Sequence, residues 1–303
     1  MQVCNALAHS HSHTHGADHS EKMLGRAFVL IAGFMFVEIA GGVLANSLTL
    51  LADAGHMFLD ASALGFSWYA MRLSRREDDH KLSYGYHRFQ VLAAFVNGLS
   101  LMALCVWILY ESLTRLQAPE QMLPIPAFAV ASVGFAINLV AFRWLHGTGD
   151  NANVRSAALH VLGDLLGSAA AITAALTVYF TGWLYADPLL ALVIVAILSR
   201  GAWRVVRDST HILLEGVPDE LDLEQIRNTL STEVPGVIEV HHVHAWALTA
   251  EKPLLTLHAN VDEQTELGAV VTSMKAVLSE TFGIHHSTIQ VEHGSCPDDG
   301  SGV

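Results

Sequence analysis

Apolar residues form six long runs in the first two-thirds of the chain. Each run is long enough for the roughly 20 residues that a helix needs to cross the hydrocarbon core of a bilayer. Only a short polar break separates the first two runs, which predicts an antiparallel helical hairpin. The runs, and so the expected membrane-spanning helices, lie at residues 25–45, 48–71, 88–112, 124–145, 156–180 and 184–203.

From about residue 210 the pattern changes to that of a folded polar domain. Apolar and charged positions alternate first at helical spacing and then at strand spacing. The predicted elements are a helix at Leu221–Glu233, strands at Val237–Leu248 and Leu254–Val261, a helix at Leu267–Phe282 and a strand at Thr288–Glu292. This order favours an α+β layer with two helices on one face of a three-stranded sheet.

Lys and Arg near the ends of the apolar runs indicate the orientation, because such residues gather on the cytoplasmic side. On the opposite side only Arg115 is found. We therefore expect both termini in the cytoplasm. The residues on the predicted cytoplasmic side are Lys22, Arg26, Arg72, Arg75, Arg76, Lys81, Arg88, Arg143, Arg155, Arg200, Arg204 and Arg207.

The predicted fold class is thus a multi-pass α-helical membrane protein, with six transmembrane helices and a C-terminal cytoplasmic α+β domain. The expected boundaries are a disordered His-rich tail at 1–21, a transmembrane domain at 22–208, the α+β domain at 209–293 and a tail at 294–303.

Composition supports a membrane location and excludes one partner. The chain is 52% hydrophobic and 15% charged, whereas soluble domains are about a quarter charged. Its net charge is −13 and it has no cluster of Lys and Arg on an exposed face, so nucleic acid is not an expected partner. The three cysteines do not form a disulfide framework or a Cys-only metal site, but the 18 histidines are clustered.

The N-terminal tail carries five of these histidines among small polar residues. Such a segment cannot bury apolar surface, so we expect it to be disordered. Alternating histidines favour weak capture of metal near the cytoplasmic entrance, and a dispensable tail is the alternative. These residues are His9, His11, His13, His15 and His19.

Two predicted transmembrane helices carry the same pair of residues. His56 and Asp60 lie four positions apart, as do His160 and Asp164. A spacing of four places both side chains on one helix face, so two facing helices offer two imidazoles and two carboxylates. That set suits a tetrahedral zinc ion. Asp53 is either an outer partner that fixes the tautomer of His56 or a residue of helix packing.

Energetics favours an occupied site over a packing role. An Asp near the bilayer centre costs about 2.5–3.5 kcal/mol on insertion scales, so Asp60 and Asp164 need one divalent ion or protons to neutralise them. Two other buried polar residues, Glu38 and Asn138, are expected to form interhelical hydrogen bonds. Gly163, Gly167 and Ser168 are expected to let a neighbouring helix approach closely.

Several separated motifs resemble those of the cation diffusion facilitator family, in particular its zinc-exporting branch. The resemblance covers roughly residues 22–293. The motifs are SLTLLADAGHMFLD, YGYHRFQVLAAFVNGL, ALHVLGDLLGS, ADPLLAL, ILLEGVP and VHHVHAWAL.

The resemblance implies a homodimer in a lipid bilayer that exchanges cytoplasmic metal for protons. It implies that His56, Asp60, His160 and Asp164 form the transport site, with zinc as the preferred ion and cadmium or cobalt also carried. A bacterial cytoplasmic (inner) membrane is the expected location.

The resemblance also implies that the C-terminal domain has a copper-chaperone-like fold, dimerises and binds regulatory zinc. The matching positions are His241, His258 and Glu292, whereas His293 and the lone Cys296 depart from simple patterns. Further histidines that lie near in sequence are His242, His244, His285 and His286. Some relatives bind metal in the loop after the second helix, where Asp78, Asp79, His80 and His87 lie here, but a charged loop is the simpler interpretation.

The predicted function is therefore efflux of a divalent metal by metal/proton antiport, and not an enzymatic activity. A membrane zinc hydrolase would need an open coordination position, and no His-Glu-x-x-His segment is present. A metal sensor that does not transport remains the other interpretation.

Overall fold

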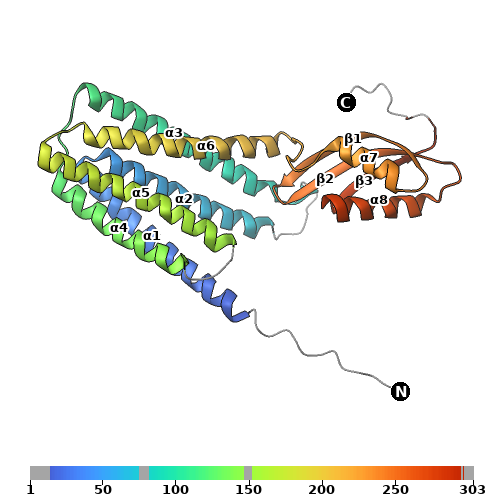
Figure 1. Ribbon diagram of the computed structural model, residues 1–303, viewed down its shortest axis with the longest axis horizontal. Coiled ribbons are helices and arrows are strands. Elements are labelled where there is room, and N and C mark those ends of the chain that lie inside the picture. The colour runs from blue at the N-terminus through green and yellow to red at the C-terminus, as the bar shows by residue number, and fades with distance from the viewer. Residues whose placement is uncertain (1–13, 75–81, 147–151, 295, 297–303) are drawn as a thin grey trace, which may run out of the picture. The chain divides into compact units, whose positions relative to one another are not determined.

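The computed structural model describes residues 14–74, 82–146, 152–294 and 296 (Figure 1). The chain divides into two compact units. A helical unit consists of residues 1–64 and 97–203, and a second unit consists of residues 65–96 and 204–303.

The six apolar runs form helices, as predicted. Four of the helices in the described part of the chain are long and apolar enough to cross a membrane. In the first two helices, the apolar stretches found among the described residues are shorter, at Val29–Ala45 and Leu48–Leu59. The helices are α1 (Thr14–Ala45), α2 (Leu48–Ser74), α3 (Arg88–Gln117), α4 (Pro124–His146), α5 (Ala152–Thr181) and α6 (Ala186–Leu213).

The prediction of a disordered tail through residue 21 is wrong in its last part. Helix α1 begins at Thr14, so His15 and His19 belong to a helix. The physical reason is propensity, because residues 21–24 are Glu, Lys, Met and Leu, which are strong helix formers that lead into the apolar run. His9, His11 and His13 lie outside the described residues.

A two-residue turn joins α1 to α2 and confirms the predicted hairpin. Asn46 has a φ of 52°, a left-handed conformation that Asn tolerates at a helix C-terminus. Arg115 on α3 holds this turn, since its guanidinium donates to the carbonyl of Asn46 at 2.8 Å and to Asn46 Oδ1 at 2.7 Å. Arg115 also pairs with Glu111 and Glu120, at 3.0 and 3.4 Å.

Small residues let α4 and α5 pack closely within the helical unit. Ala127 and Ala131 on α4 and Ala171 and Ala175 on α5 are fully buried in one cluster. Alanine at such positions brings helix backbones together, which is the usual means of association where lipid replaces water.

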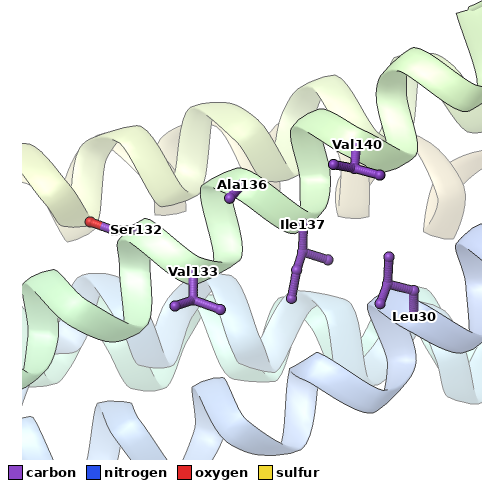
Figure 2. A pocket seen from close by; sticks show the side chains of 6 residues that line it. All are labelled: Leu30, Ser132, Val133, Ala136, Ile137 and Val140. Atoms are coloured by element: carbon purple, nitrogen blue, oxygen red, sulfur yellow. The ribbon is translucent and has the colours of Figure 1, made fainter.

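An apolar groove of about 370 Å³ lies between α1 and α4 (Figure 2). Apart from one hydroxyl, its lining side chains are aliphatic, so it offers no nitrogen or carboxylate ligand to a metal. The groove is lined by Leu30 of α1 and by Ser132, Val133, Ala136, Ile137 and Val140 of α4.

The second unit contains the predicted α-β-β-α-β order. The sheet order is β1-β2-β3, with β1 and β2 antiparallel and β2 and β3 parallel. The elements are α7 (Leu223–Glu233), β1 (Val237–Thr249), β2 (Lys252–Val261), α8 (Leu267–Phe282) and β3 (His286–Glu292).

Both helices of this domain pack into one core with the sheet. Leu230 of α7 and Met274 of α8 are fully buried in the cluster that contains Leu257 of β2. Asp222 caps α7 by accepting from the Glu224 amide at 2.9 Å, which satisfies a donor that the helix leaves unpaired. The domain therefore folds as the sequence pattern predicts.

Candidate functional site

Helices α2 and α5 carry the predicted intramembrane residues. The carboxyl of Asp164 on α5 is buried, at 1% exposure, and His56 on α2 is half-buried with a buried Nδ1 atom. Asp60 and His160 lie one helical turn from them on the same helices, which follows from the spacing of four. The side chains of Asp60 and His160 are outside the described residues.

Asp53 joins the two helices. Its carboxylate is 3% exposed and accepts a hydrogen bond from Ser168 Oγ of α5 at 3.4 Å. A Cβ atom on Gly167 would overlap this carboxylate, so glycine is required for the approach. The prediction of close approach is confirmed at Gly167 and is wrong for Gly163, beside which a Cβ would meet no atom within 4 Å.

Glu38 and Asn138 do not form the predicted interhelical hydrogen bonds. Both side chains are buried, and neither carboxylate oxygen of Glu38 nor either amide atom of Asn138 has a hydrogen-bond partner in the part of the chain that the structure describes. A buried polar group without a partner is costly and is uncommon in native proteins. The prediction was wrong because helical spacing says which face is buried, but not whether polar atoms on two helices meet.

The second unit brings four metal-ligating side chains together at one edge of the sheet. His258 Nδ1 lies 2.9 Å from Glu292 Oε1, and His241 Nε2 lies 3.2 Å from Glu292 Oε2. The Cys296 sulfur lies 3.4 Å from His258 Nδ1 and from Glu292 Oε1. One ligand atom of each of these four residues lies within 4.8 Å of the others.

Strand register explains this convergence. His241 on β1 is the direct partner of His258 on β2, and Asn260, two positions further, is the partner of Glu292 on β3. Residues two apart lie on the same face of a strand, so all three side chains share one face. After His241 the register shifts, and His242 adopts a φ of 48° with its ring stacked on His258 at 5.0 Å between centroids.

The surroundings of Glu292 favour its ionised form. Burial acts to raise the pKa, but hydrogen bonds from Gln290 and Cys296 and the charges of His258 and His241 together hold the pKa of Glu292 below its usual value. The Gln290 amide donates to Glu292 Oε1 at 2.8 Å. The sequence analysis missed Gln290, although it lies two positions before Glu292 on the same strand face.

His293 is not part of this cluster. Its Nδ1 lies 3.2 Å from the carbonyl oxygen of Val261 and does not join the four ligand atoms of the cluster. The reason is strand alternation, since consecutive side chains point to opposite faces and Glu292 already occupies the cluster face. His285 contacts Ser279 Oγ at 2.8 Å, and His286 packs edge-on against Tyr84. Cys296, in contrast, joins the cluster.

The predicted loop site is only partly within the described residues. Asp78, Asp79 and His80 lie outside them. His87 Nε2 lies 3.3 Å from the ammonium group of Lys252. A cation at this distance would repel a metal ion bound to His87. Within the described residues, one group of three or more metal-ligating side chains has its ligand atoms within 4.8 Å of one another. It is the cluster of His241, His258, Glu292 and Cys296.

Two imidazoles, a carboxylate and a thiol fit a tetrahedral zinc ion in donor type and number. Zinc sites with four protein ligands are usually structural, whereas catalytic sites keep one position open.

Comparison with known proteins shows that this chain is similar to metal transporters along most of its length. The family model for the cation efflux transmembrane domain matches residues 24–214, and that for the cytoplasmic domain of cation efflux proteins matches residues 218–294. The zinc transporter ZitB of Pectobacterium atrosepticum is 42% identical over 97% of this chain and 91% of its own length.

Two further relatives share less of their sequence. The cadmium, cobalt and zinc/H(+)-K(+) antiporter of Bacillus velezensis is 36% identical over 93% of this chain and 91% of its own. The solved metal-bound C-terminal domain of the CzcD transporter from Cuprividus metallidurans is 36% identical, covers 24% of this chain and 99% of that chain, and has a TM-score of 0.23. The family models and the full-length identities lead to one conclusion: this chain belongs to the cation efflux family, which the cation diffusion facilitator motifs had indicated.

Proposed function

We propose that this protein exports a divalent transition metal, zinc above all, from the cytoplasm in exchange for protons. One observation carries the proposal: the carboxyl of Asp164 is buried, at 1% exposure, in a helix long and apolar enough to cross a membrane. Such a group is expensive in lipid and is a functional residue by default. The names of the relatives add zinc, cadmium and cobalt as the ions that this family handles.

The transport site in this proposal consists of His56 and Asp60 on α2 and His160 and Asp164 on α5. The contact of Asp53 with Gly167 and Ser168 supports it, because that contact holds α2 against α5 one turn from Asp164. Mixed imidazole and carboxylate ligands favour zinc, cadmium and cobalt over harder ions such as manganese.

Exchange with protons follows from the chemistry of the ligands. Imidazole binds metal only when neutral and carboxylate only when ionised, so metal binding displaces protons. An unperturbed imidazole titrates near pH 6.5, and protons that enter from an acidic exterior therefore compete with the ion for His56 and His160. The inward proton gradient then drives the ion outward.

The membrane arrangement in this proposal has six spans and both termini in the cytoplasm of a bacterial inner membrane. The four long apolar helices and the distribution of Lys and Arg support it. The proposed domains are the transmembrane domain at 22–208 and the α+β domain at 209–293. In the latter, His241, His258, Glu292 and Cys296 hold regulatory zinc, and the protein works as a homodimer.

The decisive experiment is a flux measurement with purified full-length protein in proteoliposomes that contain a zinc-sensitive dye. An imposed pH gradient should drive zinc movement in the parent protein and not in Asp164→Ala, whereas Asp208→Ala, at an exposed position, should transport normally. A parent protein that binds zinc without moving it would support a sensor instead and would overturn the proposal.

A further inference from the structure

Glu38 is a fully buried carboxyl on α1 that the transport site described above does not use. Both of its oxygens lack a hydrogen-bond partner among the residues that the structure describes. An ionised carboxylate cannot remain in an apolar interior without compensation, and such a group takes up a proton or a cation instead.

The groups around Glu38 come from three other helices. On α4, a Cβ at Gly134 would lie 3.4 Å from Glu38 Oε1, and Asn138 follows one turn later, 1% exposed. The charge that acts on Glu38 is that of Asp164 on α5, and Glu38 in turn acts on Asp53 of α2. Asp164 is acidic, so it opposes a charge on Glu38.

The three carboxyls differ in what surrounds them. Asp53 accepts a hydrogen bond from Ser168, so its carboxyl has a partner. Asp164 is a ligand of the proposed ion and is neutralised when the ion binds. Glu38 has neither support, and it is not joined by a hydrogen bond to either acid in the described structure. Of the three, Glu38 is therefore the carboxyl that the geometry leaves to be neutralised by a proton.

We propose that Glu38 holds an exchangeable proton that leaves when the metal binds. This inference rests on the proposed function, because it names one residue that couples protons to metal. In the empty protein, burial and the charge of Asp164 keep the proton on Glu38. A bound dication cancels the charge of Asp164, so the repulsion falls and the O–H bond of Glu38 ionises. The electron pair stays on the carboxylate and the proton passes to water.

The first test uses the unaltered full-length protein in detergent. Dicyclohexylcarbodiimide reacts with protonated carboxyls in apolar surroundings, and peptide mass spectrometry locates the adduct. At neutral pH we expect modification at Glu38 in metal-free protein and a loss of that modification when zinc is added. Equal modification with and without zinc, including none in either sample, would overturn the proposal.

The second test counts protons released per zinc ion bound, in a weakly buffered solution with a pH indicator. Glu38→Gln keeps the shape of the side chain and removes the proton, so this variant should bind zinc and release fewer protons per ion than the parent. Glu224→Gln, at an exposed position on α7, is the control and should match the parent. Equal release from Glu38→Gln and the parent contradicts the inference.

The outcomes also separate this inference from the proposed function. If the parent protein shows no zinc flux in vesicles, the proposed function fails. If zinc flux is normal but Glu38→Gln transports with the same number of protons per ion, only the role of Glu38 fails. Where Glu38→Gln does not fold, the modification of the parent protein decides the matter.

Discussion

The carboxylate of Asp187 accepts a hydrogen bond of 2.7 Å from the backbone amide of Leu48. Asp187 lies in the first turn of α6 and Leu48 begins α2, so this bond fixes the start of one helix to the start of another. The same carboxylate accepts from Ser47 Oγ at 2.7 Å and from the Thr49 amide at 3.3 Å. Since α2 carries His56 and Asp60, Asp187 holds in place the helix that presents half of the proposed transport site.

Replacing Asp187 should therefore destabilise the helical unit. In Asp187→Asn one acceptor oxygen becomes a donor, and the first amides of α2 lose a charged partner. We expect a loss of about 1–3 kcal/mol, the range for a hydrogen bond to a charged group or for a helix cap. The measurement is thermal unfolding of the purified protein in detergent. Asp208→Asn, at an exposed position on the same helix, should leave the melting temperature unchanged.

Gly167 should tolerate no side chain, whereas Gly163 should. A Cβ at Gly167 overlaps the carboxylate of Asp53, so Gly167→Ala must move α5 away from α2 and disturb the proposed site between them. Overpacking of this kind costs about 1–3 kcal/mol, and zinc flux in proteoliposomes should fall strongly. Gly163→Ala, four positions earlier on α5, meets no atom within 4 Å and serves as the matched control. Equal flux in the two variants would show that the α2–α5 contact does not matter for transport.

Arg115 should not be replaceable by lysine. Its planar guanidinium donates to two oxygens of Asn46 and to Glu111, a geometry that an ammonium group cannot reproduce. Arg115→Lys should lower the stability of the helical unit by about 1–3 kcal/mol, because one ammonium group cannot keep all three of these hydrogen bonds. Thermal unfolding in detergent measures this loss. At the exposed position 207, Arg207→Lys should have no effect, and a loss of equal size there would contradict the explanation.

The cytoplasmic cluster should bind zinc through Glu292 and not through His293. In a full-length background with Asp164→Ala, which removes the transport site, Glu292→Ala should weaken zinc binding at least about tenfold, since even outer partners of metal ligands cost that much. Isothermal titration provides the affinity. His293→Ala should bind like its parent because His293 contacts the Val261 carbonyl instead. A weakened His293→Ala with an unaffected Glu292→Ala would reverse the assignment.

The N-terminal histidines should affect affinity and not the transport step. Deleting residues 1–13 removes His9, His11 and His13 and leaves helix α1, which begins at Thr14, intact. We expect a modest rise in the zinc concentration that gives half-maximal flux, with the maximal rate unchanged, because histidines outside the transport site only raise the local concentration of the ion. Complete loss of flux in this deletion would mean that the segment is part of the transport machinery.

The helices, the strands and the candidate ligands of this protein were predictable from the residue pattern. Long apolar runs can satisfy their backbone only as helices, and alternation at a period of two predicts strands, so the helices and the α-β-β-α-β order were predictable. The two His-x-x-x-Asp pairs were also visible, since a spacing of four is a local property of a helix.

Which polar side chains meet depends on the packing of segments that are distant in sequence. Asp53 against Gly167, Asp187 at the start of α2 and Arg115 around Asn46 each join segments far apart in the chain, and local periodicity carries no information on such contacts. The chain beyond β3 brings Cys296 into the cytoplasmic cluster, whereas His293 contacts the Val261 carbonyl instead. Glu38 was recognisable as buried, but its lack of a hydrogen-bond partner in the described structure depends on how three other helices pack around it.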